Sequence, residues 1–283
     1  MTSTILSTIA ERARGLAELG DDPSTSAPYW WFATVADGGD LVGVAMRTAP
    51  FEPYPLYLLA MPDDAAAALA DGVLDRGEEV GGVNGLRPAA DVCAERVAER
   101  TGSTVLVAMH TRLFELGELV APAPVPGRLR STRPDEVDLA HDWLVRFFGD
   151  ADEQAGRERG AGHAETASVA DIERKIREGT LWFWVGADDV PVCMVGANPP
   201  AFGVTRIAPV YTPPEHRGRG YASAATHDVS RLLRDSGARV TLFTDQANPT
   251  SNRIYQALGY APVADTVDLR LAQPPLTGGA SSP

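Results

Sequence analysis

The chain has 283 residues, a length that favours two domains, and 44% of them are hydrophobic, which is enough for a substantial core. Its formal net charge of −13 argues against a protein that binds nucleic acid or an anionic membrane through a general positive field. No apolar run approaches the ~20 residues of a membrane span, and the N-terminus lacks the pattern of a signal peptide. We therefore expect a cytoplasmic protein that uses neither of these partners.

In chain order, the first half reads as an α/β unit. Residues 4–18 have helical spacing, and the alternating stretches "YWWFATVA" and "LVGVAMRT" predict a hairpin around "DGGD". The stretch "YPLYLLAM" predicts a third strand at 54–61. The elements expected next are a helix over "DDAAAALADGVLD", a short strand over "EVGGVNG", a helix over "RPAADVCAERVAERTG" and a strand over "TVLVAMHTRLFEL".

The second half shows the same order more clearly. Residues 127–132 predict a short strand and residues 136–148 a helix, whereas the polar stretch 149–166 is expected to be a mobile loop. The elements predicted after it are a helix at 168–178, strands at 181–186, 190–197 and 203–212, a helix ending near Gly237, a strand at 239–245, a helix at 249–259 and a strand at 261–271.

The repeated order predicts two tandem copies of one α/β unit with a mixed sheet. The prolines of "LVAPAPVPGRLRST" disfavour a helix and indicate a linker. We expect one domain over residues 1–120, a linker and first strand at 121–131, a second domain over 127–271, and a disordered Pro/Gly/Ser-rich tail at 272–283. The two cysteines, Cys93 and Cys193, are expected to be buried thiols, and no zinc-type spacing predicts a metal site.

The segment "EHRGRGYAS" stands between a predicted strand and a predicted helix. The first amides of a helix have no intrahelical partner, and the helix dipole favours an anion there. Gly218 and Gly220 allow a ligand to approach the backbone closely, and Arg217 and Arg219 add positive charge. A phosphate-loop motif needs a lysine that this turn lacks, and a dinucleotide-binding motif needs a third glycine where Ser223 stands.

The run Arg217 to Ala222, "RGRGYA", resembles the Arg/Gln-x-x-Gly-x-Gly/Ala motif of the GNAT superfamily of N-acetyltransferases. The downstream stretch "FTDQANPTSNRIYQALGY" is similar to the second conserved block of that superfamily, with Asn248, Tyr255 and the pair Gly259–Tyr260 at the expected spacing. The resemblance is strong over residues 180–271 and extends back to about 127. For residues 1–118 it depends on the order of elements alone.

The resemblance implies transfer of an acetyl group from acetyl-coenzyme A to a primary amine by direct attack in a ternary complex. It implies that Tyr255 is the general acid that protonates the departing thiolate, a role that suits a phenol neutral at pH 7. It also implies contacts between the cofactor and the predicted third strand, the phosphate turn and the start of the following helix. The residues concerned are Val210, Tyr211, Thr212, Arg217, Gly218, Arg219, Gly220, Tyr221, Ala222, Asn248 and Asn252.

Several alternatives stay open. The third strand carries no carboxylate, Glu215 is poorly placed and Asp245 is a weak candidate. A base that acts through water, or an amine that arrives already neutral, fits as well, and we assign no general base. A non-catalytic sensor of coenzyme A thioesters is therefore the second hypothesis, and acetylation of a small thiol-containing amine, as in mycothiol synthase, is a substrate alternative. His216 and His227 are expected to be surface residues.

The acetyl acceptor is expected to be a small-molecule or protein amine. In the first half the stretch "MPDDAAAALA" takes the place of the phosphate turn, and its aspartates would repel a pyrophosphate. We therefore expect no cofactor site of this kind there.

Overall fold

The structure is a computed structural model that describes residues 31–47, 54–154 and 168–272. The predicted helix at 4–18, most of the predicted loop at 149–166 and nearly all of the predicted disordered tail lie outside these residues. None of the described helices is long and apolar enough to cross a membrane. Both cysteines are buried free thiols, and no group of metal-binding side chains occurs among the described residues.

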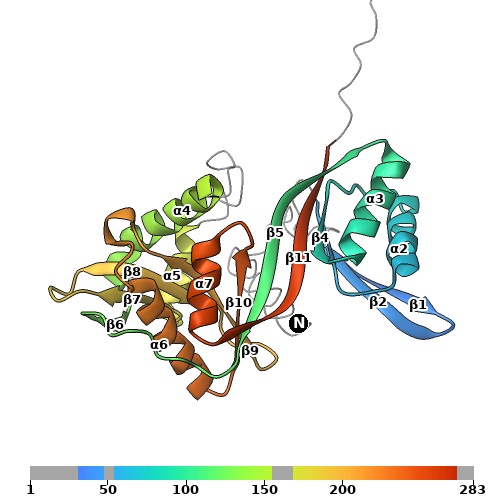
Figure 1. The fold of residues 1–283 in the computed structure, drawn as a ribbon. Helices are drawn as coiled ribbons and strands as arrows, with labels where there is room; N and C mark the ends of the chain where they lie inside the picture. The colour runs from blue at the N-terminus through green and yellow to red at the C-terminus, as the bar shows by residue number, and fades with distance from the viewer. Residues whose placement is uncertain (1–30, 48–53, 155–167, 273–283) are drawn as a thin grey trace, which may run out of the picture. The chain divides into compact units, whose positions relative to one another are not determined.

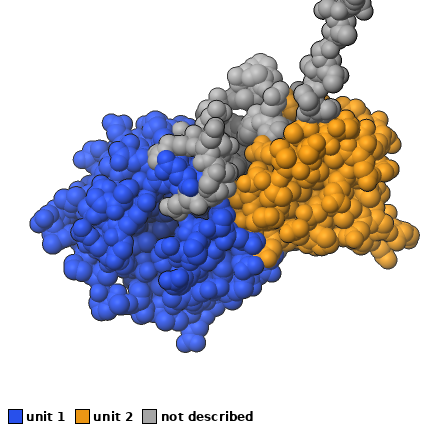
Figure 2. Space-filling model, turned by 45° about the horizontal axis from the view of Figure 1, so that its top comes forward, with its two compact units in different colours: residues 1–20, 112–264 blue, residues 21–111, 265–283 orange. Residues whose placement is uncertain are grey.

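The chain forms two compact units, coloured separately in Figure 2. Unit 1 contains Arg112–Ala264, and unit 2 contains the described residues up to Thr111 together with those from Asp265. These units do not coincide with the contiguous domains expected from the sequence, because each half of the chain ends in a long strand that passes into the other unit. Residues 112–120 belong to unit 1, and residues 265–271 belong to unit 2.

Unit 2 has a mixed sheet with both helices packed on its core (Figure 1). The strands follow the order β1-β2-β3-β4-β11-β5, and the last strand of the chain pairs antiparallel with β4 from Thr266↔Leu86 to Arg270↔Gly82. The elements are β1 (Trp31–Asp37), β2 (Asp40–Arg47), β3 (Leu56–Leu58), α2 (Asp63–Asp75), β4 (Gly82–Leu86), α3 (Ala89–Thr101) and β5 (Thr104–Leu116). β3 is shorter than the predicted 54–61, and Tyr54 before it has a positive φ of 49°.

Unit 1 has the strand order β11-β5-β10-β9-β8-β7-β6. One core cluster lies between the sheet and α6 and α7, and another lies between the sheet and α4 and α5. The elements are β6 (Arg128–Ser131), η1 (Pro134–Glu136), α4 (Val137–Gln154), α5 (Val169–Arg177), β7 (Leu181–Val185), β8 (Pro191–Ala197), β9 (Val204–Tyr211), η3 (Pro214–His216), α6 (Tyr221–Asp235), β10 (Arg239–Asp245), α7 (Pro249–Ala257) and β11 (Tyr260–Ala272). This matches the predicted order.

Helix α4 differs from the prediction, because it continues through Gly149 to Gln154 where a loop was expected. One glycine costs a helix only about 1 kcal/mol. Two contacts beyond it offset that cost: the carboxylate of Asp150 accepts hydrogen bonds from the hydroxyl of Tyr211 and from the guanidinium of Arg217. The polar composition of this stretch therefore reflects a helix end directed at other polar groups.

Candidate functional site

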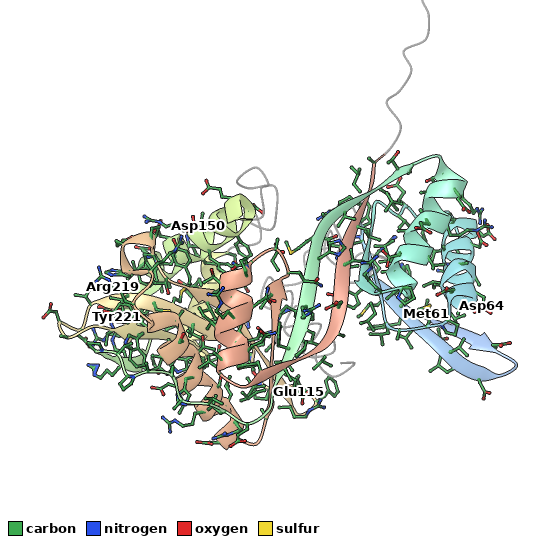
Figure 3. All side chains as sticks on the ribbon, in the orientation of Figure 1. Met61, Asp64, Glu115, Asp150, Arg219 and Tyr221 are labelled. Carbon is green, nitrogen blue, oxygen red and sulfur yellow. The ribbon has the colours of Figure 1, made fainter. Side chains whose placement is uncertain are left out.

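A cavity of about 550 Å³ in unit 1 lies where β9 ends, where α6 and α7 begin, and beside the end of α4. Figure 3 labels Arg219 and Tyr221 at the start of α6 and Asp150 on α4. Every residue predicted to form the site lines this cavity except Asn252. The tertiary structure thus brings together two sequence blocks that are separated by the whole of α6 and β10.

The two glycines of the turn both take backbone conformations that other residues resist. Gly218 has a φ of +74°, and Gly220, the N-cap of α6, has a φ of +80°. A Cβ on Gly220 would also lie 2.9 Å from Cγ1 of Val125. Residues 221–223 line the cavity, and the first bond of the helix is from the amide of Ala224 to the carbonyl of Gly220, at 3.1 Å. The amides before it have no partner within the helix and suit an anion.

Strands β9 and β10 separate beside this turn. They pair in parallel only at Val204↔Arg239, Thr205↔Val240 and Arg206↔Thr241, although β9 continues to Tyr211 and β10 continues to Asp245. The backbone of β9 from Ile207 onward is therefore not paired with β10. An extended ligand can form strand-like hydrogen bonds with such a backbone, and Val210 and Thr212 at its end line the cavity.

The two arginines of the turn have different surroundings, a distinction that the sequence did not reveal. Nε of Arg217 donates to the carbonyl of Thr212 at 2.9 Å, and its Nη2 lies 2.5 Å from the carboxylate of Asp150. Arg219 is exposed and has no ion pair among the described residues. Arg219 therefore supplies net positive charge to the cavity, whereas the charge of Arg217 is largely neutralised.

Tyr211 contacts both members of the ion pair between Asp150 and Arg217. Its hydroxyl donates to Asp150 at 3.2 Å, and the guanidinium of Arg217 lies 5.9 Å from the centre of its ring. Burial, together with the nearby carboxylate of Asp150, raises the pKa of Tyr211 to about 12. This tyrosine is therefore a neutral hydrogen-bond donor that connects the end of β9 to α4.

Tyr255 lies near the end of the nine-residue helix α7, whose N-cap is Asn248, as expected. The side chain of Asn248 accepts the amide of Ser251 at 3.0 Å. Tyr255 is 8% exposed, and its ring meets that of Tyr260 edge-on at 6.0 Å. Burial, with smaller effects of Tyr260 and Cys193, raises the pKa of Tyr255. Its hydroxyl has no hydrogen-bond partner in the described part of the chain, so the cavity presents a protonated phenol that is free to donate.

Asn252 lies apart from the cavity. Its side-chain oxygen accepts the hydroxyl of Thr244 at 2.5 Å, and its amide nitrogen donates to the carbonyl of Asn248 at 2.9 Å. These bonds join the start of α7 to the end of β10. The position of Asn252 thus fits a supporting role for Asn248, whereas a direct contact with a ligand stays a prediction from the resemblance.

Sequence reasoning missed Phe147, Asp150 and Ala151 on α4 and gave His216 no part in the site. All four line the cavity, and Nδ1 of His216 is buried without a hydrogen-bond partner. Asp150 is the only carboxylate among the described lining residues, since Glu215 and Asp245 are not part of the wall. The carboxylate of Asp150 is already paired with the guanidinium of Arg217.

The corresponding place in unit 2 is closed. β3 and β4 stay paired through Leu58↔Gly85, the last residue of β3, and a Cβ on Gly85 would overlap the carbonyl of Leu58. Helix α2 begins at Asp63 after Pro62, and its first turn carries the carboxylates of Asp63 and Asp64 (Asp64 and the preceding Met61 are labelled in Figure 3). This unit therefore lacks both the strand separation and the glycine-containing turn of unit 1.

Parallel strands that separate beside a glycine-containing helix start are the arrangement that the resemblance to the GNAT superfamily implied for this site. Residues 138–260 match the family model described as the acetyltransferase (GNAT) family. This part of the chain is a GNAT acetyltransferase domain, and the protein is an acyltransferase.

Solved structures show the same fold. A GCN5-related N-acetyltransferase from Sphaerobacter thermophilus is 17% identical with a TM-score of 0.58, over 85% of this chain and 80% of that one. One from Kribbella flavida is 17% identical with a TM-score of 0.56, over 93% and 95% of the two chains. A Drosophila protein is 13% identical with a TM-score of 0.61, over 94% and 88%. No curated protein matches the chain.

Proposed function

We propose that the protein is an N-acetyltransferase that transfers an acetyl group from acetyl-coenzyme A to a primary amine, by direct attack in a ternary complex. The observation that carries this proposal is the separation of β9 and β10 next to the two left-handed glycines of the α6 turn, with Tyr255 lining the same cavity. The geometry suits a ligand with an anionic part and an extended, amide-bearing arm.

The residues present fit coenzyme A in two places. The unpaired amides at the start of α6 and the free charge of Arg219 suit the pyrophosphate. The unpaired backbone of β9 near Val210 and Thr212 suits the amides of the pantetheine arm. Thr212 itself lines the cavity at the end of β9, beside the thiol of Cys193. When bound, the thioester supplies an activated acetyl group.

In the proposed reaction, the amine nitrogen forms a bond to the acetyl carbon while the carbon–sulfur bond breaks. Tyr255 holds its proton at Oη throughout the neutral range, because its pKa is raised by burial. It donates this proton, or a strong hydrogen bond, toward the departing sulfur. With no unpaired carboxylate in the described wall, the proton of the amine passes to water, or the amine arrives already neutral.

The test is the release of free thiol from acetyl-coenzyme A in the presence of a panel of amines, including protein amines and small thiol-bearing amines. Wild-type protein is expected to turn over with at least one of them. Tyr255→Phe should lower kcat by about 10²-fold while cofactor binding is kept. Tyr57→Phe removes a hydroxyl from β3 in unit 2, outside this cavity, and it should retain activity. Equal activity in Tyr255→Phe and wild type would exclude the general-acid role.

A sensor of coenzyme A thioesters is the second candidate, favoured by the engagement of Asp150, the one carboxylate in the described cavity wall, with Arg217. Tight binding of acetyl-coenzyme A by calorimetry, with no thiol release over the whole acceptor panel, would support this function. Turnover with any acceptor would show that the protein is an enzyme and would exclude a purely sensory role.

A further inference from the structure

In the part of the chain that the structure describes, the backbone groups along the outer edge of β1 in unit 2 pair with no other strand. β1 pairs on its inner side with β2, and among the described strands none lies beyond it. The carbonyl of Val44 on β2 accepts the amide of Leu59 at 3.1 Å, so the backbone of Val44 faces away from β1. Thr34 lies opposite Val44 in the antiparallel register, and its own N–H and C=O therefore point to the free edge. Phe32 lies opposite Met46, two residues further along each strand, so its N–H and C=O also point to the free edge.

A groove of about 330 Å³ runs along this edge, between β1 and one side of α2. The residues of α2 and its end that line it are Ala68, Leu69, Gly72, Val73 and Arg76, of which Ala68 and Gly72, one turn apart, are small. No atom lies within 4 Å of a Cβ built on Gly72, so the space beside the helix is open at this point. An edge strand next to a helix with small side chains leaves space for one more strand to pair with it.

In unit 1, a strand occupies the position that corresponds to this groove. The two halves share the order strand, strand, strand, helix, so β1 corresponds to β7 and α2 corresponds to α6. In unit 1, β6 pairs antiparallel along the outer edge of β7 from Arg128↔Val185 to Ser131↔Trp182 and also contacts α6. The groove beside β1 lies at the place that β6 takes in unit 1, and an antiparallel strand fits it.

We propose that the occupant is β1 of a second copy of this chain, so that two chains form a two-fold dimer across their β1 edges. Thr34 of each chain then exchanges both backbone hydrogen bonds with Thr34 of the other. In this register Phe32, whose side chain is 61% exposed, lies opposite Ala36 of the other chain and loses part of its exposure to water.

Charge complementarity favours β1 of a second copy of the chain, rather than a strand of another protein, as the partner of this edge. The same register places Asp37 of one chain opposite Trp31 of the other. Trp31 and Arg76 line the same end of the groove, and neither Arg76 nor Asp37 has an ion pair among the described residues. Glu78 at this end is already neutralised by Arg47, at 2.7 Å. Each dimer therefore gains two symmetric pairs between Arg76 and Asp37.

The test is the mass of the full chain by light scattering and its dissociation constant by sedimentation. Wild type is expected to have twice the chain mass of 30.1 kDa. Arg76→Glu and Asp37→Arg should each weaken the dimer by about tenfold or more, because two attractive pairs become repulsive. The combination Arg76→Glu/Asp37→Arg reverses both charges and should restore it. Thr34→Pro, which removes an outward amide, should give a monomer.

Asp188→Arg is the matched control, since Asp188 is an exposed carboxylate in a turn of unit 1. It should leave the dimer unchanged, and all variants should keep a wild-type circular dichroism spectrum. A wild-type monomer at about 100 μM, a range in which a specific dimer of standard interface size is well populated, would overturn the proposal. So would a dimer that none of the β1 and α2 variants weakens. A dimer that the single reversals weaken and the double reversal restores would establish it.

Discussion

At the scale of single residues, two arginines that carry the same charge have different roles in the cavity. Arg217 and Arg219 are two positions apart, yet Arg217 connects Asp150 to the carbonyl of Thr212, whereas Arg219 is free. A buried or paired cation contributes little to long-range attraction, and an exposed one contributes in a salt-dependent manner. Arg219 is therefore the residue expected to govern the ionic-strength dependence of cofactor binding.

Arg219→Gln should weaken binding of coenzyme A by about twofold to fivefold at low ionic strength, because one exposed charge contributes about 0.5–1 kcal/mol. The difference from wild type should shrink as salt is added, since screening removes the interaction. Isothermal titration calorimetry over a salt series measures both effects. Arg231→Gln is the control, as this exposed arginine lies on α6 away from the cavity. Equal losses in the two variants would mean that only net charge matters.

The buried tyrosines predict a loss of stability at alkaline pH. Burial raises the pKa of Tyr211 to about 12 and also raises those of Tyr255 and Tyr260. Above pH 10 these groups lose their protons in the unfolded chain but keep them in the native state, so the free energy of unfolding falls as pH rises. The stability they contribute is fully present below pH 10 and declines toward their folded pKa values.

Urea unfolding between pH 9 and pH 11.5 measures this decline. Tyr255→Phe removes one titrating group and should reduce the slope above pH 10 by up to about 1.4 kcal/mol per pH unit. A slope that is the same in wild type and variant would show that Tyr255 is not held protonated by the fold.

At the scale of elements, the same sequence of strands and helices gives an open site in one unit and a closed one in the other. β9 and β10 are paired over three residue pairs and then separate, whereas β3 and β4 are paired to the end of β3. The closed pairing depends on Gly85, whose φ is +152° and whose missing side chain lets the carbonyl of Leu58 approach. The difference between the two units therefore lies in strand pairing as much as in the glycines of the turn.

Gly85→Ala should destabilise the protein by at least about 2 kcal/mol, because it combines an unfavourable φ with overlap against a strand backbone. Gly186→Ala is the matched control: its new Cβ would lie 3.9 Å from the carbonyl of Val190, an ordinary contact. Chemical denaturation of both variants measures the difference. A loss of stability no larger than that of the control would contradict the tight pairing of β3 and β4.

At the scale of the whole molecule, each unit takes its last strand from the other half of the chain. The end of β5 lies beside β10 in unit 1, where Arg239 and Glu115 form two hydrogen bonds of 2.7 and 2.8 Å. The end of β11 pairs with β4 in unit 2. Neither half of the chain therefore contains all strands of its own sheet, and a truncation near residue 120 would leave both sheets incomplete.

One cofactor site per chain is the expected stoichiometry, because only unit 1 combines separated strands with a glycine-containing helix start. Calorimetric titration with acetyl-coenzyme A should give one site, and Gly220→Ala should weaken it, since Ala is strained at a φ of +80° and its Cβ crowds Val125. Two tight sites per chain, or a site untouched by this substitution, would show that unit 2 also binds the cofactor.

The sequence by itself determined the order of the elements, the bounds of several of them and the two blocks of the site, because these depend on local periodicity, glycine and capping. The α2 and β5 ranges agree with the predicted stretches to the residue, and Asn248 caps α7 as its position indicates. Only the tertiary structure decided the exchange of last strands, the pairing of Asp150 with Arg217 and the closure of the second site. Each joins residues far apart in the chain, and no local pattern encodes their distance.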